Sequence, residues 1–359
     1  MFETCYKPDL SETRRYLDAF WAHEVIDRPC MCVTAPKRGV EPKPFWVSPS
    51  MKYFACVCDE WKELLPKIRD SFETTWFGGE AVPQLDVTLG PDTYAAFLGG
   101  QIEGRRDSET TWSHPVLDTL EDIRIELDRS PDGAFELFRR NFRMLADWSK
   151  GKCLLNQLDY HSHFDALCAL RDPAETCMDL LDDPETVTRC LNEIADTYVP
   201  IYEALYADGD MENRGTICWD PIWLPKGRTA IVCCDYSCLL SEQQGRKFVL
   251  PYVEQEIAYL DRSVYHLDGK DALVHLDNLL AIDRLDCIQW VPGDGAPRTV
   301  EWMELLKKIQ KAGKSVWLYD WTPDEIRAHF RELDPARVVF SVSCETQDEA
   351  ERLLEDVRL

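Results

Sequence analysis

His266 and Asp268 form the sharpest chemical pattern in the sequence. They lie two residues apart in the β-prone segment 264–269, which ends in Gly269. In a strand this spacing places both side chains on one face. An imidazole and a carboxylate so arranged can chelate a metal ion, or the carboxylate can orient the imidazole as a general base. The alternative is structural: His266 would donate to a carbonyl group and Asp268 would cap a helix that begins near Asp271. The pattern alone leaves both open.

Other polar and aromatic residues stand where predicted strands end. Asp235 is a candidate acid/base or substrate-binding group, or else the cap of a helix near Ser241. Asp159 and Tyr160 offer a carboxylate and a phenol, whereas the histidines at 161 and 163 are more typical of a loop. The remaining candidates at strand ends are Trp219, Gln289, Trp290, Tyr319, Asp320 and Cys344. Strand ends are often polar because they reach the surface, so the coincidence of several is the useful signal.

The elements that must position these residues alternate regularly from residue 132 onward. Short apolar strands alternate with amphipathic helices, which indicates parallel βαβ units. Nine strands are predicted, near residues 31, 84, 154, 217, 232, 264, 288, 316 and 339. This number favours an α/β fold of the (β/α)8 TIM barrel type, in which catalytic groups sit at the carboxyl ends of the strands. An open doubly wound sheet is the second choice, but no glycine-rich nucleotide motif follows any strand.

The predicted barrel is a single domain that covers residues 1–359. Residues 1–75 form an N-terminal extension of helix and loop together with the first strand, and 100–131 form an irregular, polar insertion with some extended structure. One long helix is expected over 241–260, and a strand over 216–222.

Composition excludes several classes of function. The chain of 359 residues has a formal net charge of −25, which disfavours binding to nucleic acids and to anionic membranes. No apolar run is long enough to span a bilayer and no secretory signal is visible, so a cytoplasmic protein is expected. The fifteen cysteines are typical of reduced thiols. Cys233 and Cys234, on opposite faces of one strand, are interpreted as core residues.

Several segments together resemble the uroporphyrinogen decarboxylase superfamily. They are His266-Leu267-Asp268-Gly269, Asp277 with Leu279-Leu280, Asp286 to Trp290, Leu89-Gly90-Pro91, Ala95 to Gly99 and Asp235-Tyr236-Ser237. The resemblance covers roughly residue 75 to the end and implies a (β/α)8 barrel. The superfamily contains decarboxylases of the porphyrin pathway and zinc-dependent methyltransferases that act on corrinoid proteins.

The decarboxylase branch binds an octacarboxylate through paired N-terminal arginines, which this chain lacks. The methyltransferase branch holds zinc with a His-x-Cys at a strand end and a second Cys about eighty residues later. The matching positions here are His266, Asp268 and Cys344, the last of which follows His266 by 78 positions. Carboxylate in place of thiolate makes the metal harder, which favours a methyl ether, a methylamine, a sugar or another oxygen compound over a thiol as substrate.

The resemblance thus implies a zinc-dependent methyltransferase that moves a methyl group between a small substrate and a corrinoid protein. His266, Asp268 and Cys344 would hold zinc, while Asp235, Asp159 and Tyr160 would serve catalysis. The substrate would contact Trp219, Gln289, Trp290, Tyr319 and Asp320. Two alternatives stay open: a metal-free decarboxylase or other lyase with Asp235 and His266 as acid and base, and a ligand-binding barrel without catalysis. A homodimer is expected from the family.

Overall fold

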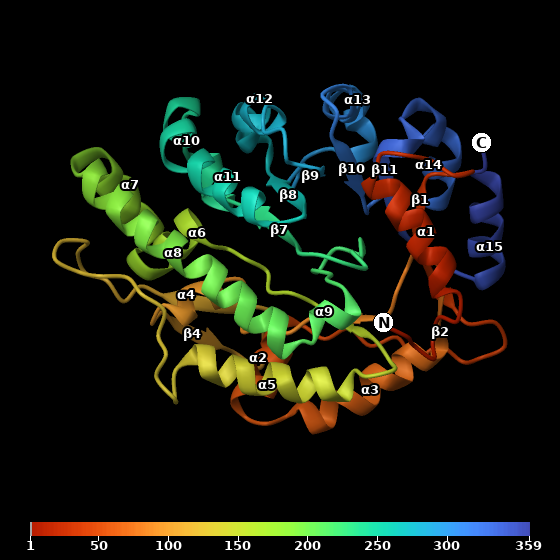
Figure 1. The fold of residues 1–359 in the computed structure, drawn as a ribbon, viewed down its shortest axis with the longest axis horizontal. Coiled ribbons are helices and arrows are strands. Elements are labelled where there is room, and N and C mark those ends of the chain that lie inside the picture. The colour runs from red at the N-terminus through yellow and green to blue at the C-terminus, as the bar shows by residue number, and fades with distance from the viewer. Residues whose placement is uncertain (1) are drawn as a thin grey trace.

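The computed structural model describes residues 2–359 as a mixed α/β fold built around parallel strands (Figure 1). The strands are β1 (Cys30–Pro36), β2 (Thr75–Gly79), β3 (Gln84–Leu85), β4 (Gln101–Gly104), β5 (Thr111–His114), β6 (Leu154–Leu155), β7 (Thr229–Cys233), β8 (Arg262–Asp268), β9 (Cys287–Val291), β10 (Ser315–Leu318) and β11 (Val338–Ser343). The helices are α1 (Leu10–Trp21), α2 (Pro49–Val57), α3 (Trp61–Thr74), α4 (Thr93–Phe97), α5 (Ala134–Trp148), α6 (His163–Arg171), α7 (Pro173–Asp182), α8 (Pro184–Asp208), α9 (Met211–Arg214), α10 (Glu242–Phe248), α11 (Leu250–Tyr259), α12 (Leu276–Leu280), α13 (Met303–Lys311), α14 (Pro323–His329) and α15 (Gln347–Asp356).

The main sheet has seven strands in the order β2-β1-β11-β10-β9-β8-β7. Within this sheet, neighbouring strands run parallel from β1 through β11, β10, β9 and β8 to β7. The edge strand β2 pairs with β1 in the antiparallel sense. The short strands β3 and β6 form a separate parallel pair, and a parallel bridge between Tyr160 and Val232 links the chain after β6 to β7. The first and last strands of the parallel series, β1 and β11, are therefore neighbours.

Two apolar cores lie on opposite sides of these strands. The larger one packs the strands against the helices. The smaller one gathers side chains from β1, β6, β7, β8, β9, β10 and β11 around the segment 216–224. Because successive strand residues point to opposite faces, each strand contributes to both cores. β7 shows this, since Ala230 and Val232 belong to the larger core and Ile231 belongs to the smaller one.

Most predicted strands and helices are confirmed, with three corrections. Residues 216–222 are not part of the sheet: Thr216 bridges Leu224 in the antiparallel sense, and the segment between them contributes to the smaller core. The helix predicted over 241–260 divides into α10 and α11, because Pro251 lacks the N–H needed to continue a helix. The sequence interpretation also missed the helices α2 and α6, of which α6 follows the loop after β6.

The polar region 100–131 contains the antiparallel pair β4 and β5. None of the helices in residues 2–359 combines the length and the apolar character needed to cross a bilayer.

Candidate metal centre

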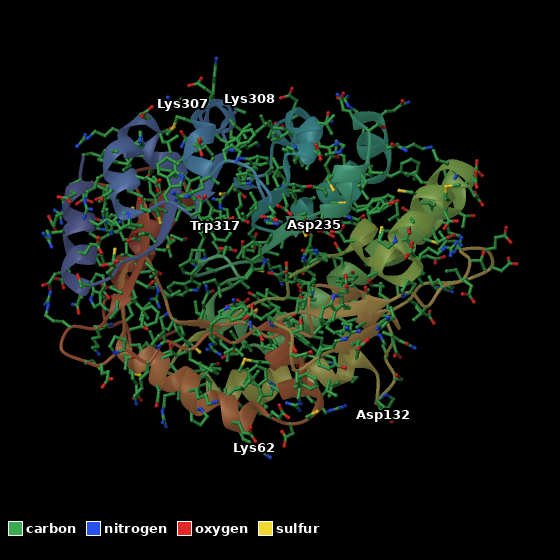
Figure 2. The ribbon with its side chains drawn as sticks, turned by 180° about the vertical axis from the view of Figure 1, so that it is seen from behind. Lys62, Asp132, Asp235, Lys307, Lys308 and Trp317 are labelled. Atoms are coloured by element: carbon green, nitrogen blue, oxygen red, sulfur yellow. The ribbon has the colours of Figure 1, made fainter. Side chains whose placement is uncertain are left out.

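The carboxyl ends of β7 and β8 bring together the residues of the His-x-Asp pattern. Cys233 is the register partner of His266, and His266 is the register partner of Gln289. Beyond the end of β7, Asp235 reaches the same region as Asp268, so that ligand atoms of Asp235, His266 and Asp268 all lie within 4.8 Å of one another. In Figure 2, Asp235 and Trp317 lie toward the middle of the molecule, whereas Lys62, Asp132 and Lys307 lie at its periphery.

The imidazole of His266 is oriented by two neighbours. Its Nδ1 lies 2.6 Å from the amide oxygen of Gln289, and because that oxygen only accepts, Nδ1 carries the proton. Nε2 is then left with its lone pair, as a metal ligand requires. The indole of Trp219 packs edge-on against the imidazole, with ring centroids 5.5 Å apart. Gly269, which has a φ of +79°, turns the chain away directly after Asp268.

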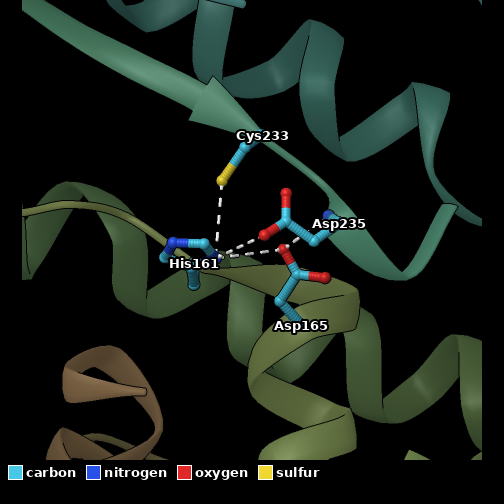
Figure 3. Close-up of side chains that lie close together, drawn as sticks. All are labelled: His161, Asp165, Cys233 and Asp235. Carbon is cyan, nitrogen blue, oxygen red and sulfur yellow. Dashed lines mark hydrogen bonds and ion pairs between the residues drawn. The ribbon is translucent and has the colours of Figure 1, made fainter. Parts of the chain in front are cut away.

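A second group of side chains adjoins the first and shares Asp235 with it. His161, Asp165, Cys233 and Asp235 place one ligand atom each within 4.8 Å of the others (Figure 3). Nδ1 of His161 lies 3.5 Å from a carboxylate oxygen of Asp165 and 3.7 Å from one of Asp235. The sulfur of Cys233 is 3.7 Å from the same nitrogen. Three polypeptide segments thus meet here: the loop after β6, the first turn of α6 and the end of β7.

Further hydrogen bonds fix the members of this second group. Nε2 of His161 lies 3.2 Å from Asp159, whose other oxygen accepts the indole N–H of Trp219 at 3.0 Å. The Asp165 carboxylate accepts the backbone N–H groups of Asp235 and Tyr236, at 3.0 and 2.9 Å. Asp165 therefore fixes the backbone that carries Asp235.

The crowding of carboxylates shifts several pKa values. Burial and the charge of Asp165 raise the pKa of Asp235 to about 6, against the opposing effect of His161 and His266. Burial would lower the pKa of His161, but the anionic groups around it, Asp159 and Asp165 among them, raise it well above its ordinary value. Burial would likewise raise the pKa of Asp159, yet its contacts with His161 and Trp219 lower it. The whole cluster favours a bound positive charge.

Three of the predicted site residues lie apart from these groups. Tyr160 is fully buried, packs against Tyr198 and Tyr202 and donates to Gln157, so its phenol belongs to the core. Trp290 points to the helix side of the sheet, where it contacts Trp302.

Cys344 follows β11, which is separated from β8 by β10 and β9. Its thiol is buried, its pKa is raised to about 11 chiefly by that burial, and within residues 2–359 it belongs to neither ligand group. The structure therefore does not bring the third expected zinc ligand to His266 and Asp268, and Asp235 stands in that place instead.

The remaining predicted residues line cavities beside the site. A cavity of about 550 Å³ is bordered by Tyr319, Asp320, Thr34 and Ser341. Tyr319 packs on Trp317, which in turn contacts Trp219. The carboxylate of Asp320 accepts hydrogen bonds from Thr299 and is thus engaged on the helix side. A smaller cavity of about 130 Å³ is lined by Trp219, Asp159 and Gln157 among others.

His161, Asp165 and Cys233 are the functional candidates that the sequence interpretation did not select. His161 follows a predicted strand end, the position that pointed to Asp159. Cys233 precedes Asp235 by two positions, so the period of a strand could have placed both on one face. Asp165 carried no comparable signal, because α6 was not expected.

Comparison with known proteins gives a likeness of fold. No family model matches the chain, and no curated protein matches it by sequence. Among solved structures, it is similar to a methyltransferase from Methanosarcina mazei, with a TM-score of 0.58 and 10% sequence identity. The match covers 96% of this chain and 98% of the other. The two proteins share their overall architecture along nearly the whole chain.

Proposed function

We propose that this protein is a zinc-dependent methyltransferase that moves a methyl group between a small neutral substrate and a corrinoid carried by a partner protein. The observation that carries the proposal is the convergence of Asp235, His266 and Asp268 at strand ends, in a chain with the fold of a methyltransferase. The uroporphyrinogen decarboxylase superfamily remains the family that the sequence resembles.

The proposed scaffold is a (β/α)8 barrel in which β6 and β3 continue the curve of the sheet beyond β7 and back toward β1, whose other edge is covered by β2. Support comes from the smaller core, which contains Cys30 of β1, Leu154 of β6, Ile231 of β7 and Val339 of β11. Side chains from both ends of the strand series can share one core only if the strands curve around it. The candidate metal centre then lies at the mouth where barrel enzymes carry out catalysis.

The donor set fits zinc. One imidazole nitrogen and two carboxylates are acceptable zinc ligands, and three protein ligands leave the open position of a catalytic site. Bound there, zinc would act as a Lewis acid on the substrate's heteroatom. Gln289 would hold the His266 ring in its binding orientation through the 2.6 Å contact, and the indole of Trp219 would shield the imidazole from water.

The larger cavity favours a neutral substrate over a carboxylate. Hydroxyl, thiol and aromatic groups line it, and its lining residues include neither lysine nor arginine. A carboxylate bound there would have no counter-charge in the wall, which argues against the metal-free decarboxylase. Tyr319, which is 41% exposed, would contact the substrate from the cavity side.

The test is methyl transfer to chemically reduced cob(I)alamin, used in place of the corrinoid protein. We expect the zinc-loaded protein to form methylcobalamin from at least one of a panel of neutral methyl ethers, followed by absorbance. The variant His266→Ala should lose at least about a hundredfold in rate, because the nitrogen ligand is gone.

Cys344→Ala is the matched control, and it should retain the wild-type rate since Cys344 lies outside both ligand groups. Absence of methylcobalamin with every methyl ether in the panel would contradict the proposal. Methyl transfer that survives complete removal of metal by a chelator would contradict the role of zinc.

A further inference from the structure

In the second ligand group, His161 Nδ1 stands from its three neighbours at the distances that separate the ligands of one tetrahedral ion. Ligand atoms about 2.0–2.3 Å from a zinc ion stand roughly 3.3–3.7 Å from one another. The distances from His161 Nδ1 to its three neighbours are 3.5, 3.7 and 3.7 Å. The two distances to carboxylate oxygens are longer than those of good N–H···O hydrogen bonds, whereas the contact with the Cys233 sulfur is within the range of a weak hydrogen bond.

The surroundings of the group are those of metal ligands. A histidine that binds a metal through one nitrogen characteristically donates from the other to a carboxylate. His161 does so, since its Nε2 lies 3.2 Å from Asp159. Asp159 is fixed in turn by Trp219, and Asp165 is fixed by two backbone N–H groups. These contacts leave His161 Nδ1 and the sulfur of Cys233 directed at the common centre (Figure 3).

The two groups differ in donors and in exposure. Cys233, only 1% exposed, adds a sulfur ligand that the group of His266 and Asp268 lacks. A nitrogen, sulfur and carboxylate set selects zinc or a similar transition metal over magnesium or calcium. With four protein ligands it is a closed position, in contrast to the three-ligand group beside it.

We propose that the protein binds a pair of transition-metal ions, with the carboxylate of Asp235 shared between them. His161, Asp165 and Cys233 hold the second ion, and His266 and Asp268 hold the first, which rests on the proposed function. The second ion is structural: it joins the loop after β6, α6 and β7, and it fixes the shared carboxylate. Binding it releases the proton of the Cys233 thiol, which becomes a thiolate ligand.

Cobalt(II) titration tests the pair, because thiolate coordination to cobalt gives a charge-transfer absorption band in the near ultraviolet. Metal-free protein is used in which the exposed Cys5, Cys58 and Cys238 are replaced by serine, so that exposed thiols do not contribute. We expect two equivalents of cobalt and a thiolate band.

Variants assign the band to one position. Cys233→Ala should bind one equivalent and lose the band, whereas His266→Ala should bind one equivalent and keep it. Cys234→Ala is the control, since this neighbouring thiol is buried on the opposite face of the strand, and it should behave as wild type. Circular dichroism confirms that each variant is folded. Asp159→Asn should keep both equivalents but weaken the thiolate position by about 10–100-fold.

The outcomes separate the two proposals. If the protein binds one equivalent of cobalt without a thiolate band, and His266→Ala no longer binds it, the metal pair is overturned and the proposed function stands. A thiolate band that persists in Cys233→Ala also overturns the pair. If the protein binds one equivalent of cobalt with a thiolate band, and only Cys233→Ala removes that band, both the pair and the metal position of the proposed function are overturned.

Discussion

His266 is oriented by an amide rather than by a carboxylate. Its Nδ1 contact with Gln289 fixes the ring without adding charge to a site that already holds several carboxylates. Gln289→Leu removes the acceptor, so we expect the zinc affinity of the His266 position to fall by about 10–100-fold. Competition with a chromophoric chelator measures the change.

Trp290→Phe provides the matched control for that variant. Trp290 follows Gln289 in β9 but points to the helix side, and its replacement should leave zinc affinity unchanged. Equal affinities for Gln289→Leu and the wild type would show that the amide does not orient the ligand.

Asp220 is a buried carboxylic acid away from the candidate metal centre. One oxygen accepts the Ile222 N–H at 2.7 Å, the other has no partner among the described residues, and burial raises its pKa to about 7. The unfolded carboxyl ionises near pH 3.8. Between these two pH values the folded state binds more protons than the unfolded state. The contribution of the Asp220 carboxyl to the free energy of unfolding is therefore fully present below about pH 4 and is lost as the pH rises toward 7.

Asp220→Asn should remove this pH dependence. Because one pKa unit corresponds to about 1.4 kcal/mol, the free energy of unfolding of the variant relative to wild type should rise by up to about 4 kcal/mol between about pH 4 and pH 8. Urea denaturation at several pH values measures this difference. The exposed Asp132→Asn should show no such trend, and a flat difference for Asp220→Asn would place its carboxyl in an ionised state when folded.

At the residue scale, sequence reasoning finds what local spacing can show. His266 and Asp268 belong to one strand, so the period of two is by itself enough to place them together. His161, Asp165 and Cys233 come from three segments, and their meeting depends on the bridge between Tyr160 and Val232. Cys344 illustrates the reverse case, since a spacing taken from a family that the sequence resembles does not ensure that two strand ends meet.

The end of β8 depends on a single glycine. Gly269 has a φ of +79° and a ψ of 143°, a region that side chains with a Cβ rarely adopt, although nothing within 4 Å would meet the added methyl. Gly269→Ala should therefore cost about 1–3 kcal/mol of stability through backbone strain alone. Because the strain displaces Asp268, zinc affinity should fall as well. Thermal unfolding and the chelator competition measure the two effects.

Gly295→Ala is the control for this element. Gly295 also has a positive φ and open space around its Cα, so its replacement should lower stability without changing zinc affinity. If both variants lost stability and neither lost affinity, Asp268 would not be a ligand.

At the element scale, the alternation of strand and helix was predictable because apolar runs and amphipathic periods are local properties. Segment 216–222 was misassigned because a buried, apolar stretch has the composition of a central strand wherever it packs. Its place inside the smaller core depends on side chains from strands distant in the sequence. The division between α10 and α11 was readable from Pro251.

The whole molecule carries a net charge of −25, and self-repulsion of this size opposes compaction. Raising sodium chloride from about 0.05 to 0.5 M shortens the screening length to a few ångströms. We therefore expect the urea concentration at the unfolding midpoint to increase with salt. Urea is required, since guanidinium is itself a salt. A midpoint that falls or stays constant would mean that attractive ion pairs outweigh the repulsion.

The pairing of β1 with β11 also has a consequence during synthesis. Cys30 of β1 meets its register partner, Val339, only when nearly the entire chain exists. While the ribosome is still translating, β1 presents an unpaired edge that other nascent chains can occupy. We expect translation products that end before β11 to aggregate or to recruit chaperones, and release of the last few dozen residues to be the step that makes the protein independent of them.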